Sequence, residues 1–312
     1  MMSSKRFSRV LSLAVVTVVA CGAPDDGTDT DPVSLQCGHQ GVLYEPGEEF
    51  TTGDGCVTYR CEDSGTLTPT LDNRITIAGD LDLPTAEDVA AQACVGVVEG
   101  SLTISGTAAD LSALGQLTRV GGTLDISASD TVTLHGLEAL TEVGAGIIIA
   151  DNAALTSMSF MPNLSVFGGI EIRNNDALVS LAGAEFLSQC QSCSAIMAGN
   201  GDGQAAEAPG FGDEGGVPGG TFYGNILIAD NDVLSDLRAM SNLVFAWESV
   251  RFRNNAALTD LRVLQLSEVR GDLEITDHAA LAAGAADAFA ARIDVWGMRL
   301  LCGNMGGAAC PE

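Results

Sequence analysis

Basic, histidine and aromatic residues are all scarce in this chain. It holds 14 lysine and arginine residues against 41 aspartate and glutamate residues, a formal net charge of −27 at pH 7, and only 5% of its residues are aromatic. A surface of this charge repels nucleic acid and anionic lipid headgroups, and it attracts cations or basic partners. We therefore expect no nucleic-acid partner.

Sequence signatures of catalysis are missing as well. The chain lacks a G-x-S-x-G nucleophile elbow, a P-loop, an H-E-x-x-H zinc motif and the strand, glycine turn and helix of a dinucleotide-binding fingerprint. Its three histidines, His39, His135 and His278, lie far apart without a serine or cysteine partner in a recognisable setting. We therefore expect no catalytic residue, no cofactor and no enzymatic activity.

The N-terminal apolar run, residues 10–20, follows three basic residues and is too short to cross a bilayer, which is typical of a signal peptide. Its end, "VVAC", resembles the bacterial lipobox, which implies cleavage after residue 20 and attachment of diacylglycerol to Cys21. Gly22 resembles the outer-membrane default of lipoprotein sorting. We expect an exported protein, anchored to the bacterial outer membrane through this lipid alone. A plain signal peptide is the alternative.

Two small segments follow the expected signal. Residues 21–36 are acidic, rich in small residues and without periodicity, so we expect a disordered tether. Residues 37–66 hold three cysteines, and a module this small needs covalent staples. The spacing in "CGHQGVLYEPGEEFTTGDGCVTYRCEDSG" resembles the first half of a von Willebrand factor type C module, which implies a β-hairpin knot. Because the second half is missing, a cysteine such as Cys94 would be borrowed from the next domain.

Disulfides are expected because cysteines other than Cys21 form an even set in an exported chain. Their connectivity does not follow from the sequence. Zinc at residues 190–193 is the alternative, but the chain has few histidines and no second close cysteine pair beside this one, so we expect no metal. The disulfide candidates are Cys37, Cys56, Cys61, Cys94, Cys190, Cys193, Cys302 and Cys310.

Short strand-like segments recur along the rest of the chain, each centred on an apolar residue. These central residues are Ile104, Ile126, Ile149, Ile172, Ile228, Phe252 and Ile275, separated by 22, 23, 23, 56, 24 and 23 residues. A fixed period in this range is the signature of a solenoid. Ile196 lies 24 residues after Ile172. We therefore expect the long interval to hold one degenerate turn and an extruded glycine-rich insertion at about 198–222, either functional or disordered.

Each repeat has the same internal pattern. Asparagine or aspartate pairs follow the strand, and stacked turns would align their second members into a hydrogen-bonded ladder. Apolar residues then recur every third residue, a step that is neither helical nor strand-like. We expect an all-β fold over residues 67–312, a right-handed parallel β-solenoid of seven or eight turns with a C-terminal disulfide cap. The expected ladder comprises Asn152, Asn175, Asn231, Asn255 and His278.

The segments "CVGVVEGSLTISG", "DLSALGQLTRVGGTLDIS" and "LHGLEALTEVGAGIIIADNAALTSM" resemble the receptor L-domain of insulin-receptor and epidermal-growth-factor-receptor ectodomains. The resemblance covers residues 94 to about 302 and implies a leucine-rich-repeat-like β-helix. The chain has no furin-like region and no kinase, so transmembrane signalling is not implied. The residues that match the family pattern are Cys94, Gly100, Gly122, Gly146, Gly169, Asn152 and Leu155.

Strand alternation assigns a mixed apolar and charged face to the outside of the solenoid. We interpret this face as a contact surface for a protein or glycan. A merely solvated sheet, and hence an envelope spacer without a ligand, is the first alternative. A polysaccharide-acting enzyme is the second, since Asp125 and Glu171 lie two turns apart at a spacing compatible with an inverting pair. The candidate binding residues are Ile148, Glu171, Arg173, Leu227, Arg251 and Arg253.

Overall fold

The computed structural model describes residues 36–39, 41–158, 164–184 and 220–311, which belong to two units, Met1–Arg74 and Ile75–Glu312. The first unit contains two antiparallel sheets. One pairs β1 (Cys37–His39) with β2 (Val42–Tyr44), and the other consists of β3 (Glu49–Thr51), β4 (Val57–Cys61) and β5 (Leu67–Asp72).

A disulfide and a small aromatic cluster stabilise this first unit. Cys37 is bonded to Cys61, and the rings of Tyr44 and Phe50 stack with their centroids 3.9 Å apart. Cys56 is disulfide-bonded as well, which agrees with the expectation that so small a unit needs staples. Strand β5 pairs with β4, so the boundary expected after residue 66 is corrected to Arg74.

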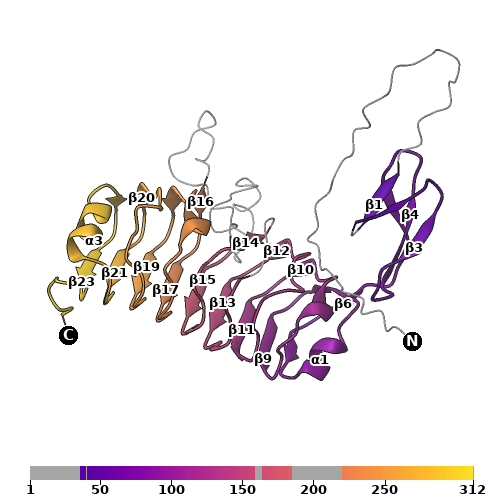
Figure 1. The fold of residues 1–312 in the computed structure, drawn as a ribbon, viewed down its shortest axis with the longest axis horizontal. Helices are drawn as coiled ribbons and strands as arrows, with labels where there is room; N and C mark the ends of the chain where they lie inside the picture. The colour runs from indigo at the N-terminus through magenta and orange to yellow at the C-terminus, as the bar shows by residue number, and fades with distance from the viewer. Residues whose placement is uncertain (1–35, 40, 159–163, 185–219, 312) are drawn as a thin grey trace, which may run out of the picture. The chain divides into compact units, whose positions relative to one another are not determined.

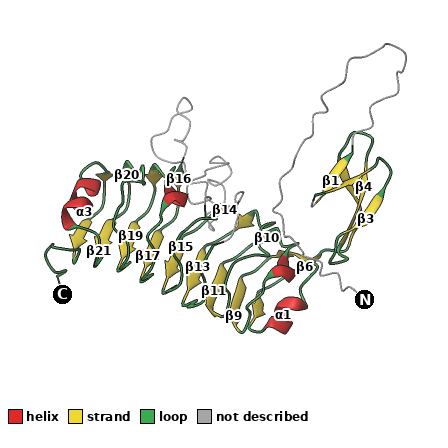
Figure 2. Ribbon diagram, viewed as in Figure 1, coloured by secondary structure: helices red, strands yellow, loops and turns green. Residues whose placement is uncertain are grey.

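The second unit is a parallel β-solenoid of about eight turns, as the sequence period predicts (Figures 1 and 2). Its long strands form one nine-stranded sheet, the broad sheet, in which strands of successive turns are parallel neighbours. The strands are β7 (Leu81–Leu83), β9 (Leu102–Gly106), β11 (Leu124–Ser129), β13 (Ile147–Ala150), β15 (Ile170–Arg173), β17 (Ile226–Ala229), β19 (Val250–Arg253), β21 (Leu273–Thr276) and β23 (Arg299–Cys302).

Shorter strands form two further parallel sheets, the short sheets. The first contains β6 (Ile75–Ile77), β8 (Val95–Val98), β10 (Arg119–Val120), β12 (Glu142–Val143) and β14 (Ser165–Val166). The second contains β16 (Thr221–Phe222), β18 (Phe245–Ala246), β20 (Glu268–Val269) and β22 (Asp294–Val295). The described helices of the unit are α1 (Ala86–Ala90), α3 (Ala283–Ala290) and the 3-10 helices η1 (Ser112–Leu114) and η3 (Arg238–Met240).

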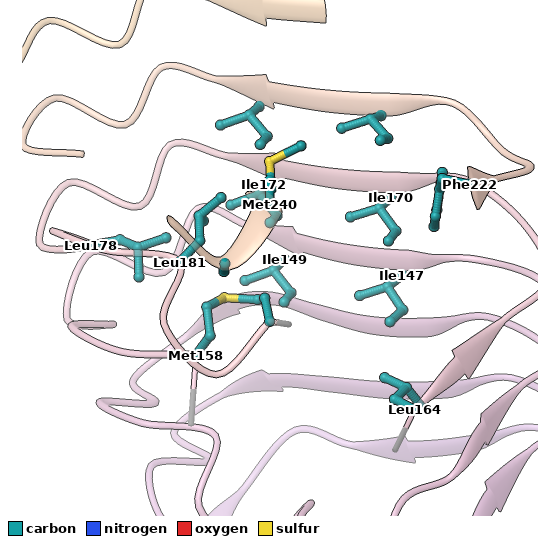
Figure 3. Close-up of a cluster of buried hydrophobic side chains, with 14 of the residues drawn as sticks. Ile147, Ile149, Met158, Leu164, Ile170, Ile172, Leu178, Leu181, Phe222 and Met240 are labelled. Carbon is teal, nitrogen blue, oxygen red and sulfur yellow. The ribbon is translucent and has the colours of Figure 1, made fainter. Parts of the chain in front are cut away.

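The core is a stack of identical strand positions. Ile126 pairs in register with Ile149, and Ile149 pairs with Ile172; all three side chains are fully buried. Figure 3 shows Ile149 and Ile172 beside buried leucine and methionine side chains from other parts of the turns. Burying such a side chain contributes about 1.5–3 kcal/mol. Because a single turn cannot bury its own apolar residues, the stack as a whole forms the core.

The threefold apolar step arises from consecutive tight turns. Leu114 donates its backbone N–H to the carbonyl of Leu111, and Leu117 donates to Leu114 in the same way. Bonds from residue i+3 to residue i give three residues per turn and place every third side chain on one side. Each of these leucines is fully buried. The step therefore marks the face of the connecting arc that packs against the broad sheet.

The expected extra turn in the long interval is wrong. Strand β15 pairs directly with β17, with Ile172 opposite Ile228, so no turn lies between them in the broad sheet. Ile196 and the insertion up to residue 219 lie outside the described residues. The expected end of the insertion at 222 is also corrected, because Thr221–Phe222 form β16 and pair with β18.

The interval does interrupt the short sheets, since β14 ends the first and β16 begins the second. Gly220 begins the described chain on the far side of this interruption. Its φ is +78°, and a Cβ at this position would lie 1.7 Å from the carbonyl oxygen of Asn242. Only glycine fits a left-handed conformation this close to a neighbouring backbone.

Candidate functional site

The broad sheet gathers all the predicted binding residues on one face. Parallel pairing places Ile148, Glu171, Leu227, Arg251 and Glu274 at successive positions of one column. Neighbouring strands are about 4.8 Å apart, so adjacent side chains of the column are in contact range. A second column two residues further along each strand contains Ala150, Arg173, Ala229, Arg253 and Thr276.

The arginines of this face are paired with acidic residues. The Arg173 Nε lies 2.5 Å from Glu171 Oε1, and its Nη1 lies 2.8 Å from Asp151 Oδ2. The hydrogen bond that Arg173 donates to Glu171 is the main cause that raises the pKa of Arg173. Ile148 and Leu227 were expected to be exposed, but each is half-buried. The sequence therefore overestimated both the unpaired charge and the exposed apolar area of this face.

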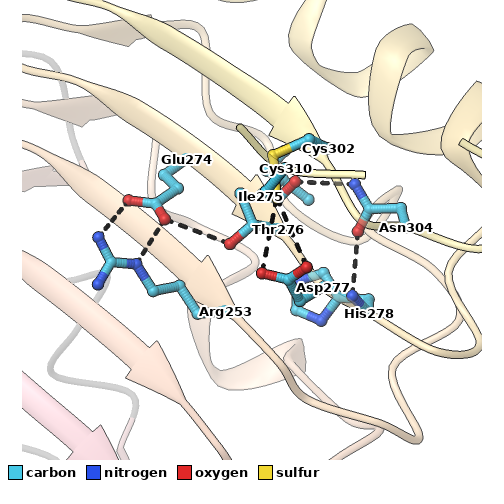
Figure 4. Close-up of a disulfide and its surroundings, with 9 residues drawn as sticks. All are labelled: Arg253, Glu274, Ile275, Thr276, Asp277, His278, Cys302, Asn304 and Cys310. Carbon is cyan, nitrogen blue, oxygen red and sulfur yellow. Dashed lines mark hydrogen bonds and ion pairs between the residues drawn. A yellow bond between two sulfur atoms is a disulfide. The ribbon is translucent and has the colours of Figure 1, made fainter. Parts of the chain in front are cut away.

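Glu274 is the acidic centre of the C-terminal half of this face, and sequence reasoning did not select it. Only 8% of the residue is exposed. Its two carboxylate oxygens accept from Arg253 Nε and Nη2 at 2.5 and 2.6 Å (Figure 4). Arg251 Nε lies 3.7 Å from Glu274 Oε2. Its hydrogen bonds raise the pKa of Arg253. The signal available in the sequence was the outward position of Glu274 beside two arginines of the preceding turn.

The predicted asparagine ladder is a continuous column of hydrogen bonds behind this face. Asn175 Oδ1 accepts from the backbone N–H of Asn152 at 3.2 Å, and Asn231 Oδ1 accepts from Asn175 at 3.1 Å. Each amide also donates to a strand carbonyl, as Asn231 does to Ile172. The side chains are fully buried, so these hydrogen bonds satisfy polar groups that would destabilise the fold if they were buried without a partner. The column extends to Ser129 at one end and Asn304 at the other.

The residues just before the ladder turn the chain at each corner. They adopt positive φ, from +41° at Asn254 to +61° at Asp277. Asparagine and aspartate tolerate this left-handed region better than other non-glycine residues. The first member of each Asn/Asp pair therefore sets the backbone turn, and the second forms the ladder.

His278 occupies a ladder position held by asparagine elsewhere. Its Nδ1 accepts the backbone N–H of Asn255 at 3.1 Å and lies 3.3 Å from the carbonyl oxygen of the same residue, and its buried Nε2 has no hydrogen-bond partner. Burial is the main cause that lowers the pKa of His278. This arrangement requires the neutral ring, because a protonated Nδ1 cannot accept. Catalytic partners do not surround it.

A column of aromatic and arginine side chains, which we call the aromatic column, stacks beside the short sheet of the C-terminal half. Its members Tyr223, Trp247, Arg270 and Trp296 each follow one of the strands β16, β18, β20 and β22. The rings of Tyr223 and Trp247 are nearly parallel, at 14° and 5.9 Å between centroids. The guanidinium carbon of Arg270 lies 4.7 Å from the centroid of Trp247 and 4.1 Å from that of Trp296.

Sequence reasoning missed this column because the same position holds unlike residues in earlier turns: Gly121 after β10, Gly144 after β12 and Phe167 after β14. The signal that could have revealed the column is that each of its members directly follows a short strand. The column ends at the last turn, where large apolar side chains are exposed. Trp296 is 62% exposed, Met298 73% and Leu300 38%.

The carboxylates considered for glycoside hydrolysis are separated and engaged. Asp125 lies on β11 and Glu171 on β15, with β13 between them, which corresponds to about 10 Å at about 4.8 Å per strand. Asp125 accepts a hydrogen bond from Ser127, and Glu171 accepts one from Arg173. The spacing stays compatible with an inverting pair, but each group already has a partner on its own strand.

No family model, curated protein or solved structure matches this chain. In the part of the chain that the structure describes, no three histidine, cysteine, aspartate or glutamate side chains are grouped to hold a metal ion. The described helices include none long and apolar enough to cross a membrane.

The structure describes six of the nine cysteines, and all six are in disulfides. Cys302 is bonded to Cys310 at the end of the solenoid (Figure 4), and Cys94 is disulfide-bonded as well. The expectation of disulfides is thus confirmed for the described cysteines. The predicted lipid-attachment residue Cys21, the tether and the pair Cys190 and Cys193 lie outside the described residues.

Proposed function

We propose that this protein is an exported lipoprotein of the bacterial cell envelope, anchored at the outer membrane through Cys21, whose solenoid binds a protein or glycan without catalysing a reaction. The observation that carries the proposal is the broad sheet, which presents Ile148, Leu227 and their charged neighbours in register on one continuous surface. Ion pairs such as Arg173 with Glu171 hold these side chains in place. A preorganised surface of this kind loses little side-chain entropy on binding.

The resemblance of residues 94–302 to receptor L-domains supports a binding role for the same solenoid. The lipobox resemblance around Cys21 supports the anchor. Metabolic labelling with a clickable fatty acid tests the anchor separately: the parent protein should incorporate the label, and a Cys21→Ser variant should not. Label on both proteins, or on neither, would contradict it.

The broad face is tested with soluble Cys21→Ser protein as bait in envelope extracts. The double variant Ile148→Glu/Leu227→Glu should lose the partner that the parent bait enriches. Val179→Glu/Val233→Glu is the matched control, because it adds the same charge at exposed valines of the arcs that follow β15 and β17. Equal recovery by all three baits would favour the spacer without a ligand. Loss by the control pair as well would indicate a charge effect and not a binding face.

A further inference from the structure

We propose that the C-terminal end of the solenoid binds an extended segment of a partner protein, and that an arginine of this segment stacks on the outer face of Trp296. This surface lies on the last turn and does not rest on the broad-face proposal. Three features carry it: the aromatic column, the edges of the end strands and an exposed apolar stripe.

The aromatic column shows which chemistry fits Trp296. Arg270 lies between Trp247 and Trp296, at 4.7 and 4.1 Å from their centroids, so the ring faces look along the stack of turns. Trp296 directly follows β22, the last described strand of its sheet, and 62% of the residue is exposed. Its inner face receives a guanidinium, and its outer face is open. A second guanidinium would continue the same alternation by a cation–π contact.

The last strands leave backbone groups open for pairing. Strand β23 ends the broad sheet and β22 ends its short sheet among the described residues. Met298 and Cys302 accept backbone bonds from the preceding turn, at the N–H groups of Leu273 and Asp277. The alternation of a parallel ladder therefore directs the N–H and C=O groups of Arg299 and Leu301 to the free edge.

The residue types of this edge strand leave room for a further strand beside residues 299–301. Residues 294–302 contain neither proline nor lysine, the usual protection of an edge. The tail occupies only the C-terminal end of the strand, where Gly303 donates its backbone N–H to the carbonyl of Ala308 and Cys302 is bonded to Cys310. The Arg299 side chain folds back and donates to the carbonyl of Ile293 at 2.6 Å, so it does not cover the edge. An extended segment can add to such an edge through main-chain hydrogen bonds.

The apolar stripe is specific to this end. Trp296, Met298 and Leu300 alternate along the chain, and all three are exposed. The preceding turn has Asp272 and Glu274 where the last turn has Met298 and Leu300. Apolar side chains on an open strand edge favour a partner that buries them.

Charge selects the kind of partner. With a net charge of −27, the chain attracts a basic segment and repels an acidic one, including a second copy of itself. The expected guanidinium site on Trp296 also favours a basic segment. The occupant is therefore an extended, arginine-bearing segment of another protein.

The two tryptophans of the chain are Trp247 and Trp296, so tryptophan emission reports on this column alone. We would titrate the full chain carrying Cys21→Ser with a short capped peptide that alternates valine and threonine around one arginine. The same peptide with citrulline, which keeps the shape without the charge, is the matched ligand. We expect saturable binding of the arginine peptide, weakened about threefold or more by citrulline. A backbone N-methylated arginine peptide should not bind.

Two variants locate the contact. Trp296→Leu should lose the preference for arginine over citrulline, while Trp247→Phe should retain it because that ring lies beneath Arg270. Thermal unfolding shows whether Trp296→Leu is folded, and Ile148→Glu/Leu227→Glu should bind the peptide as the parent does. No saturation by the arginine peptide, equal binding of both peptides or an unchanged preference in Trp296→Leu would overturn the proposal. A concentration-dependent dimer in light scattering that Trp296→Leu abolishes would also overturn it, since the occupant would then be a second copy.

Discussion

The interior turns and the last turn of the solenoid solve the same packing problem in different ways. In the interior, outward arginines pair with acidic residues of their own or a neighbouring turn, and buried asparagines bond to the next asparagine. The last turn keeps the strand register but exposes Trp296 and Met298, and a disulfide closes it. A repeated turn is thus satisfied by its neighbours, whereas a terminal turn needs separate devices.

The ladder shows how strongly an interior turn depends on its neighbours. In Asn231→Ala, the backbone N–H and side-chain amide of Asn175 lose their acceptor, and the carbonyls of Ile172 and Ala229 lose a donor. We expect the free energy of unfolding to fall by about 3 kcal/mol or more, because each buried orphan group costs about 1–3 kcal/mol. Urea unfolding followed by circular dichroism measures this.

The matched control for the ladder variant is Asp232→Ala, one residue away and exposed. It should change the free energy of unfolding by less than about 0.5 kcal/mol. Similar losses in the two variants would mean that the ladder contributes nothing beyond its local turn.

His278 keeps the acceptor of the ladder but lacks the side-chain donor that asparagine supplies elsewhere, so His278→Asn should make this region resemble the interior. Asparagine retains a side-chain acceptor and adds a donor, and we expect a gain of about 1 kcal/mol at neutral pH. Because the pKa of His278 is lowered in the folded protein, protonation favours unfolding. The histidine form therefore loses stability as the pH falls below about 6.5, by up to about 1.4 kcal/mol per pH unit, and the variant lacks this loss.

Unfolding curves between neutral and mildly acidic pH test the histidine prediction. His135→Asn is the control, because His135 is exposed and pairs with Glu138 at the surface. This variant should not gain the stability at neutral pH that we expect for His278→Asn. Parallel curves for the parent and His278→Asn would show that the buried ring remains neutral or finds another partner on protonation.

The ion pairs of the broad face should have the smallest effect on stability. Arg173→Gln removes contacts to Glu171 and Asp151, but the three side chains are partly exposed. Such pairs contribute about 0–1 kcal/mol, and less at high salt. Arg119→Gln, which breaks the exposed pair with Glu142, is the reference. If Arg173→Gln alone lowered the free energy of unfolding by more than about 2 kcal/mol, the ion pairs of this face would serve mainly to stabilise the fold.

Features that repeat could be predicted from the sequence, because each copy reports the same environment. The strand centres, the corner Asn/Asp pairs and the threefold step all recur, and the structure places Ile126, Ile149 and Ile172 in one register as their spacing implies. The extra turn around Ile196 was inferred from spacing alone. It was wrong because a matching interval does not show that a segment pairs with its neighbours.

Features set by contacts between different turns could not be predicted. Whether Arg253 stays free depends on the direction of its side chain and on Glu274, which lies one turn later. The aromatic column was hidden because its position varies between glycine and phenylalanine in earlier turns, so the repeat pattern gave no reason to align Trp247 with Arg270 and Trp296. Pairing in such a column is decided by rotamers, which strand alternation does not fix.

The interruption between β14 and β16 has a practical meaning for engineering. The broad sheet continues from β15 to β17 without a change of register, while the short sheets are divided at this corner. The described chain leaves this corner at Ala184 and returns at Gly220. Loop insertions between two such anchors have a low thermodynamic cost. This corner is therefore a suitable site for grafting a foreign domain onto the solenoid.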